Sequence, residues 1–342
     1  MKKHLHIRYL SVILISSLAF YLASDNLVDV FNKIDENLKY NSVILNKIDC
    51  TFEVIEFADR SNHDCTFVGN KIWSFDKPSD GGWVVSVNTD GSDAKRIFRT
   101  SFYDENGLEI EMKSVDCAFG GLLVGNGSAI SWKEKDKYEH CAYIFYDYLQ
   151  WEKSANNASV PITFDNCGFY TKINLSELGA KVYAFYGGGE DIILVSCNLF
   201  NDIYEIELGK GMIDLGKGDY SPTSCDKYNG SYKILSHLHQ AGAIGQFAAH
   251  GGQYYNGALY LASNDPSKCL VYRIKIRDNT SLKFEELNFN IYSDKLNYYG
   301  NIPVKLVYSY IDGLCIKDGK IYAQILNVNG IQSGSFVIVA EI

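Results

Sequence analysis

The stretch GNKIWSFDKPSDGGWVVSVNTDGSDAKRI, Gly69–Ile97, indicates the fold more directly than any other part of the sequence. Two apolar runs, NKIWSF and GWVVSV, are separated by a polar bend, and a D-G turn follows the second run. β-Branched and aromatic residues favour strands, while Gly, Asp and Asn favour the turns between them. The stretch therefore predicts two antiparallel strands, which form either an isolated hairpin or one unit of a repeat.

Units of the same kind recur along the rest of the chain. In each unit, a central apolar run, here called the anchor, is followed by a second apolar run and preceded by a third. For the first anchor, the preceding run is CTFEVIEF. Three strands repeated at a near-constant period are typical of radial repetition. The anchors follow Gly- or Asn-containing turns and lie 58, 62, 67 and 62 residues apart, at Ile72, Ile130, Ile192, Leu259 and Ile321.

This periodicity predicts an all-β protein, a β-propeller of five or six blades, with the sixth placed around NGSYKILSH. The composition fits a chain of strands and tight turns, because it includes 25 Tyr, 18 Phe and 29 Gly but only 5 Pro. A β-sandwich, or a pair of sandwiches, is the alternative that the irregular period leaves open.

The two ends of the chain predict how the ring closes. The C-terminal run GSFVIVAEI reaches the last residue, and NSVILNKIDCTFEVIEF (Asn41–Phe57) is its expected partner in a final blade built from both ends. Residues 41–342 would then form one propeller domain. Residues 25–40 predict a short N-terminal helix, because four apolar residues fall on one helical face: Leu27, Phe31, Ile34 and Leu38.

Residues 1–24 have the pattern of a secretory signal peptide. A basic start precedes the apolar run Tyr9–Leu22, and the small residues Ala23 and Ser24 follow it. A membrane-spanning helix needs roughly 20 apolar residues, so this shorter run predicts a cleaved signal rather than an anchor. No later run is long and apolar enough to span a bilayer. We expect a secreted, extracellular protein with no membrane span after signal removal.

Two further features agree with export. Nine cysteines lie beyond residue 24, and in an oxidising compartment most would pair as disulfides. Because nine is odd, at least one would stay unpaired or bond to another chain. No CxxC occurs, which argues against a zinc ribbon. Five N-x-[ST] sequons would accept N-linked glycans in a eukaryotic secretory pathway: Asn126, Asn157, Asn174, Asn229 and Asn279.

The charge balance restricts the partners. The chain has 41 Asp and Glu against 32 Lys and Arg, a formal net charge of −9, and removal of the basic start would make it more negative. It contains no run rich in Lys or Arg. Because an acidic surface repels phosphate backbones, we expect no nucleic-acid partner.

The stretch NKIWSF followed by VVSVNTDGSDAKRI resembles a blade of the YWTD-type propellers of the low-density-lipoprotein-receptor class. In that family an I-Y-W-type strand precedes a strand that ends in a D-G turn. DGKIYAQI and GALYLASNDPSKCLVYRIKI resemble the same blade more loosely, while the YWTD tetrapeptide is absent and the period of about sixty residues is longer than in the family. The resemblance implies an extracellular six-bladed ring used for binding rather than catalysis. It implies no particular ligand or binding residue.

Few motifs point to chemistry. The stretch SHLHQAGAIGQFAAHGG contains His237, His239 and His250, and the first two would share a face of a strand. Three neutral imidazoles can bind zinc or copper, so these residues are the candidate metal ligands, while surface histidines are the simpler interpretation. GGGED (Gly187–Asp191) is rich in Gly but lacks a following GK[ST], which argues against phosphate binding.

These observations predict a secreted glycoprotein that acts as a binding module for an extracellular protein or glycan. The alternative is a propeller-fold hydrolase with a polar site in its central channel, with or without a metal. The sequence identifies no catalytic residue and no cofactor. Some of the tyrosines on the blade rims could stack on sugar or peptide ligands.

Overall fold

The computed structural model describes a set of β-strands and a short helical insertion. All the described elements belong to one unit, formed by Val43–His239 and Ile244–Ile342. The predicted signal peptide (residues 1–24) and the predicted helix (residues 25–40) lie outside the described residues. The described residues are 46–57, 64–76, 81–110, 112, 114–126, 140–156, 159–178, 182–197, 202–211, 228–239, 248–263, 271–275, 283–288, 298–299, 302–303, 309–327 and 335–342.

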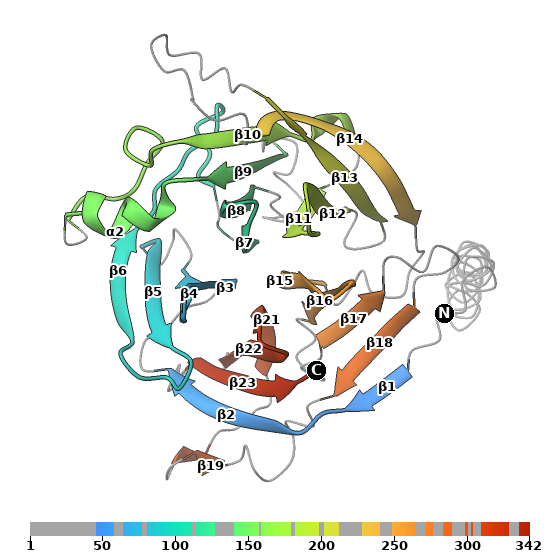
Figure 1. The fold of residues 1–342 in the computed structure, drawn as a ribbon. Helices are drawn as coiled ribbons and strands as arrows, with labels where there is room; N and C mark the ends of the chain where they lie inside the picture. Colours follow the sequence, from blue (N-terminus) through green and yellow to red (C-terminus); the bar gives the residue numbers. More distant parts are fainter. Residues whose placement is uncertain are drawn as a thin grey trace, which may run out of the picture. The chain divides into compact units, whose positions relative to one another are not determined.

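Five β-sheets are arranged around a central axis, which makes the unit a five-bladed β-propeller (Figure 1). From the centre outward, blade 1 contains β3 (Cys65–Val68), β4 (Lys71–Phe75), β5 (Trp83–Asn88) and β6 (Lys95–Arg99). Blade 2 contains β7 (Val115–Ala118), β8 (Gly121–Asn126), β9 (Cys141–Phe145) and β10 (Tyr170–Asn174). Blade 3 contains β11 (Val182–Gly187), β12 (Ile192–Cys197), β13 (Asp202–Lys210) and β14 (Tyr228–His239).

The last two blades include strands from the start of the described chain. Blade 4 contains β15 (Ala248–Tyr255), β16 (Ala258–Ser263), β17 (Val271–Lys275), β18 (Lys283–Asn288) and β1 (Asn46–Asp49). Blade 5 contains β21 (Ser309–Lys317), β22 (Lys320–Asn327), β23 (Ser335–Glu341) and β2 (Phe52–Phe57). A separate two-stranded sheet joins β19 (Tyr298–Tyr299) and β20 (Ile302–Pro303).

The stretch Gly69–Ile97 folds as its pattern predicts and belongs to blade 1. β4 and β5 pair antiparallel, with Ile72 opposite Val87. The D-G turn after β5 is held by the amide of Gly91, which donates to the carbonyl of Asn88 at 2.9 Å. This stretch is one unit of a repeat rather than an isolated hairpin.

Three strand assignments made from the sequence are wrong. CTFEVIEF does not precede the first anchor in blade 1, because β3 occupies that place and β2 pairs instead with β23. The second strand of blade 2 is β8 rather than a run at Ile130, which lies outside the described residues; Leu122, Leu123 and Val124 supply its fully buried side chains. NGSYKILSH forms no sixth blade, because it lies in β14 and pairs with β13.

The predicted ring closure is confirmed. β2 pairs antiparallel with β23, with Val54 opposite Ile338, so one blade contains strands from both ends of the described chain. The preceding strand β1 pairs parallel with β18 and adds a fifth strand to blade 4. Residues 46–57 therefore connect blades 4 and 5 along the outer edge of the ring (Figure 1).

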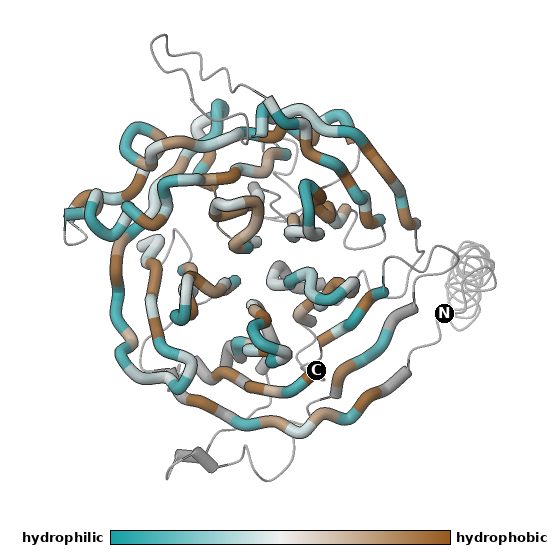
Figure 2. Tube along the Cα trace, in the orientation of Figure 1, coloured by the Kyte–Doolittle hydropathy of each residue, from teal (hydrophilic) through white to brown (hydrophobic). Residues whose placement is uncertain are grey.

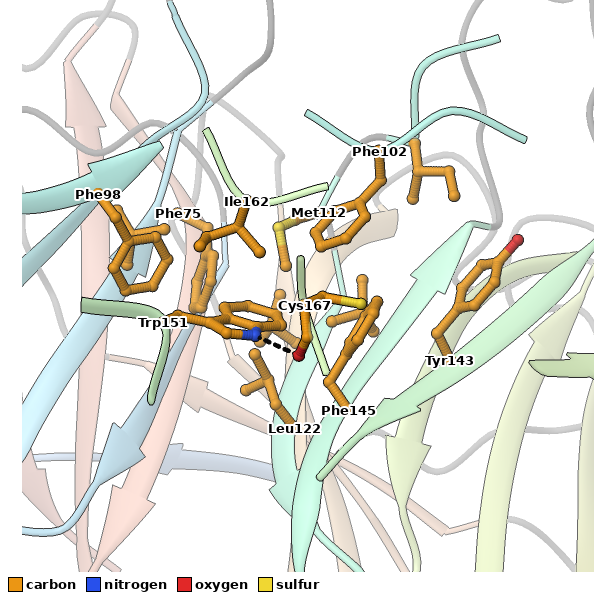
Figure 3. Close-up of a cluster of buried hydrophobic side chains, with 14 of the residues drawn as sticks. Phe75, Phe98, Phe102, Met112, Leu122, Tyr143, Phe145, Trp151, Ile162 and Cys167 are labelled. Atoms are coloured by element: carbon orange, nitrogen blue, oxygen red, sulfur yellow. Dashed lines mark hydrogen bonds between the residues drawn. The ribbon is translucent and has the colours of Figure 1, made fainter. Parts of the chain in front are cut away.

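Apolar side chains alternate with polar ones along several strands, and the apolar ones pack between neighbouring blades. Along β13, Ile206 and Leu208 are buried and Glu207 between them is exposed. Figure 2 shows hydrophobic and hydrophilic residues following one another along the strands. Blades 1 and 2 enclose the aromatic cluster drawn in Figure 3. At its centre is Trp151 of α2 (Trp151–Ser154), whose Nε1 donates to the carbonyl of Cys167 at 2.9 Å. This bond allows the indole to be buried with its only donor satisfied.

Blades 2 and 3 approach so closely that only glycine fits at one position. A Cβ atom at Gly125 would lie 1.8 Å from Cδ2 of Phe185, whose side chain is fully buried. We predict that Gly125→Ala lowers the free energy of unfolding by roughly 1–3 kcal/mol, because the ring must leave its rotamer or the blades must separate. Urea denaturation measures this change.

The matched control is the same substitution in a Phe185→Ala background. Without the ring, the three atoms nearest to the added methyl group are absent, so Gly125→Ala should cost clearly less there than in the wild type. An equal cost in both backgrounds would show that contact with Phe185 is not what requires glycine at this position.

Candidate functional site

The inner strands of neighbouring blades are joined by side chains that accept backbone hydrogen bonds. Between blades 1 and 2, the Oδ2 atom of Asp64 accepts the amide hydrogen of Val115 at 2.9 Å. Two residues on, Oγ1 of Thr66 accepts the amide hydrogen of Cys117 at 3.0 Å. Each contact satisfies a buried or partly buried amide that has no strand partner on that side.

Side chains also accept backbone hydrogen bonds between blades 2 and 3. The hydroxyl of Ser114 accepts the amide hydrogen of Phe185 at 2.9 Å and donates to the carbonyl of the same residue. The Oδ2 atom of Asp116 accepts the amide hydrogen of Gly187 at 3.1 Å. Ser114 thus takes the place of Asp64 in the next blade, and Asp116 takes the place of Thr66.

Blades 4 and 5 are joined by longer side chains. The Oε1 atom of Gln253 accepts the amide hydrogen of Ile316 at 2.5 Å. The hydroxyl oxygen of Tyr255 accepts the amide hydrogen of Gly319 at 3.1 Å. Between blades 3 and 4 the backbone comes close instead, since a Cβ at Gly252 would lie 2.6 Å from Cε1 of Tyr186. The contacts between the inner strands therefore differ from one pair of neighbouring blades to the next.

Burial changes the acidity of the two aspartates. Asp116 has 4 % of its surface exposed, and desolvation raises its pKa from 3.8 to about 7, although amides of Gly187 and Cys117 partly offset this. Burial also raises the pKa of Asp64 well above its usual value, with a smaller contribution from the charge of Asp116. Both carboxyl groups are therefore unusually ready to carry a proton near neutral pH.

A pocket of about 460 Å³ opens beside Asp116, and its lining comes from blades 2, 3 and 4. Part of the Gly-rich stretch GGGED lines the pocket, through Gly187, Glu190 and Asp191. The sequence argues against phosphate binding by this stretch, because no GK[ST] follows it. Two aromatic rings, those of Phe119 and Tyr254, are only partly buried there. The other lining residues are Asp116, Cys117, Ala118, Gly189, Lys210, Tyr228 and Gln253.

One wall of this pocket is a fixed polar network. Asp191 forms an ion pair with Lys210 at 2.7 Å and accepts a hydrogen bond from the hydroxyl of Tyr228 at 2.6 Å. The bond to Lys210 and then that to Tyr228 lower the pKa of Asp191. The ring of Tyr228 also packs edge-on against Phe119, with centroids 5.6 Å apart. The pocket thus combines an ionised carboxylate, a cation and aromatic surface.

The histidines singled out in the sequence are placed on two different blades. His237 lies on β14, where its Nε2 is 2.8 Å from Oδ1 of Asp202 and its ring stacks on Tyr204 with centroids 4.2 Å apart. His239 follows on the same strand, and His250 lies on β15 of blade 4. The side chains of His239 and His250 lie outside the described part of the structure. Among the described residues, no three His, Cys, Asp or Glu side chains gather as a metal site requires.

Two of the five sequons are described together with their side chains. Asn174 ends β10 and Asn229 lies on β14, and both are exposed. Each side chain accepts the amide hydrogen of the Ser of its own sequon at 3.0 Å. Asn126 ends β8 with its side chain undescribed, and Asn157 and Asn279 lie outside the described residues.

The expected disulfides are not present among the described cysteines. All seven carry thiols: Cys50, Cys65, Cys117, Cys141, Cys167, Cys197 and Cys315. Five of these seven thiols are buried, namely Cys65, Cys141, Cys167, Cys197 and Cys315. Cys225 and Cys269 lie outside the described residues.

Sequence reasoning missed the pocket, because its lining comes from several separate segments of the chain. Two of the lining residues have an unusual backbone conformation: Phe119 and Asp191 both adopt positive φ, 59° each. Such a conformation is uncommon for residues other than glycine and often marks a functional position. Sequence alone does not reveal it.

Comparisons with known proteins identify no family. No protein-family model and no curated protein matches the chain. Solved structures similar to it include a streptogramin B lyase (10% identity, TM-score 0.37, covering 85% of this chain and 98% of that chain). Another is the tail fibre of a Staphylococcus aureus phage (11% identity, TM-score 0.43, covering 85% of this chain and 53% of that chain). A third is a WD40 β-propeller domain (11% identity, TM-score 0.36, covering 85% of this chain and 96% of that chain). At these TM-scores the likenesses carry no argument about function.

The raised pKa of Asp116 predicts a pH dependence of stability. Between about pH 4 and pH 7 the folded protein keeps a proton on this carboxyl that the unfolded chain releases. The free energy of unfolding therefore falls as the pH rises through this window, by on the order of a few kcal/mol. The variant Asp116→Asn is the reference protein, because its side-chain oxygen can still accept the amide hydrogen of Gly187 but its amide group does not titrate.

Urea unfolding of both proteins from pH 4 to pH 8 measures this effect. We expect the stability of the wild type relative to Asp116→Asn to decrease between about pH 4 and pH 7, while contributions from groups that do not interact with Asp116 cancel in the difference. A difference that stays constant over the whole range would mean that Asp116 titrates normally.

Proposed function

We propose that the chain is a secreted glycoprotein whose β-propeller binds a glycan in the pocket lined by blades 2, 3 and 4. The observation that carries this proposal is the combination, in one cavity of about 460 Å³, of partly exposed rings with carboxylate, amine and amide groups. A cavity of that size suits a ligand of a few sugar units.

Sugars have apolar faces of C–H groups and edges of hydroxyl groups, and the pocket offers a partner for each. The rings of Phe119 and Tyr254 supply flat apolar surface, on which a sugar face can stack. Glu190 and Gln253 supply acceptors and a donor for hydroxyl groups. The net charge of −9 favours a neutral ligand over a polyanionic one.

Export is part of the proposal and is supported by the sequence. The basic start and apolar run of residues 1–24 fit a signal peptide. The exposed positions of Asn174 and Asn229 leave both sequons accessible for glycosylation. The resemblance of Gly69–Ile97 to YWTD-type blades also agrees with an extracellular binding role. Among the described residues, no helix is long and apolar enough to cross a membrane.

A hydrolase is the second candidate, favoured by one observation. Asp116 and Asp191 line the same pocket, and their environments move the pKa of the first up and that of the second down. A protonated and an ionised carboxyl group are the pair used in glycoside hydrolysis. However, Asp191 is already engaged by Lys210 and Tyr228, which suits a fixed binding group better than a nucleophile.

The proposal is tested on an array of oligosaccharides, followed by calorimetric titration with the oligosaccharide that binds best. We expect Tyr254→Ala to weaken binding at least about tenfold, equivalent to about 1.4 kcal/mol, because the stacking surface is lost. Glu190→Gln should weaken it less, since the amide still accepts a hydrogen bond. Tyr103→Ala is the matched control, because Tyr103 is 52% exposed and does not line the pocket.

Equal binding by the wild type and Tyr254→Ala would contradict the placement of the ligand. Retention of peptides rather than oligosaccharides would replace the glycan with a protein partner. Release of new reducing ends from the bound oligosaccharide, abolished in Asp116→Asn while binding persists, would establish the hydrolase instead.

A further inference from the structure

The seam between blades 1 and 5 contains two cysteines that face each other. Cys65 lies on β3 and Cys315 on β21, the inner strands of the two blades. Their sulfur atoms are 3.6 Å apart, with the thiol of Cys65 donating to Sγ of Cys315. Both side chains are buried, with 4% and 0% of their surface exposed. This contact joins two of the seven described cysteines.

The strands at this seam are already held together by other contacts. Ser74 and Gln324 exchange hydrogen bonds at 3.1 and 2.9 Å. The ammonium group of Lys317 donates to the carbonyl of Gly69 and to Oδ1 of Asn70, both at 2.7 Å. A disulfide has an S–S distance of about 2.05 Å, so the two sulfurs need to approach by roughly 1.5 Å to form the bond.

We propose that Cys65 and Cys315 are a disulfide-forming pair that covalently joins blade 1 to blade 5 when the chain folds under oxidising conditions. The bond would close a loop across 250 residues, the separation of the two cysteines in sequence. It would join the blade that opens the ring to the blade that completes it. The proposal does not depend on the ligand of the pocket.

The bond forms by exchange with a low-molecular-weight disulfide such as oxidised glutathione. The thiolate of one cysteine attacks a sulfur of the oxidant, which forms a mixed disulfide and releases one glutathione thiolate. The second cysteine, as its thiolate, then attacks the protein sulfur of the mixed disulfide and displaces the second glutathione. The two protein thiols lose two protons and two electrons in total, and the oxidant is reduced to two thiols.

Burial determines when this exchange takes place. The folded seam excludes water from both thiols, and desolvation holds the pKa of Cys315 well above its usual value. Because the thiolate is the reactive form, the folded reduced protein should oxidise slowly. Exchange should instead proceed while the ring is still closing, before the seam is sealed.

Peptide mapping of refolded protein tests the proposal. The wild-type chain is refolded from denaturant with reduced and oxidised glutathione, treated with an alkylating reagent under denaturing conditions and digested without reduction. We expect a linked peptide pair containing Cys65 and Cys315, with neither residue alkylated. Alkylation of both residues, or linkage of either one to a different cysteine, would overturn the proposal.

Thermal unfolding provides a second measurement. Reductant should lower the melting temperature of the oxidised wild type by roughly 5 °C or more, because it removes a cross-link over a long loop. Cys65→Ala and Cys315→Ala should show no response to reductant. Cys197→Ala, a buried cysteine of blade 3, should keep the full response. An equal response in Cys65→Ala and the wild type would also overturn the proposal.

Discussion

Backbone amides on the inner strand of one blade donate hydrogen bonds to side chains that lie on, or directly before, the inner strand of the preceding blade. This contact recurs from blade 1 to blade 2 and from blade 2 to blade 3, with Asp64, Thr66, Ser114 and Asp116 as acceptors. Inner strands pair within their own sheet on one side only, so their other edge carries amides that need partners. Side-chain acceptors satisfy these amides without merging neighbouring sheets.

The same contacts give the site its electrostatic character. A carboxyl group placed to accept an amide at the seam is removed from water, which favours its protonated form. Asp116 therefore joins two blades and at the same time lines the pocket beside them. On the opposite side of blade 1 the seam is closed differently, by Ser74 with Gln324 and by a pair of thiols. The ring is thus held by contacts whose chemistry varies from seam to seam.

Much of the fold could be predicted from the sequence, because it depends on local patterns. The two strands and D-G turn of Gly69–Ile97 lie next to each other in sequence, and the terminal strand had an apolar partner at Phe52–Phe57. Outer strands were harder to assign. β14 includes exposed Ile234 and Leu235, so its apolar content suggested a blade of its own rather than the edge of blade 3. The pocket could not be predicted, because its residues come from three blades that only the closed ring brings together.

Residue-resolved hydrogen exchange of the folded protein tests this arrangement most directly. If side-chain acceptors hold the inner strands, the amides of Val115, Cys117 and Gly187 should exchange as slowly as those at strand centres, through global unfolding alone. Exchange of these three amides at the rate of exposed turn amides, while the strand centres stay protected, would show that the seams open independently. That result would contradict a ring held together by side-chain acceptors at its seams.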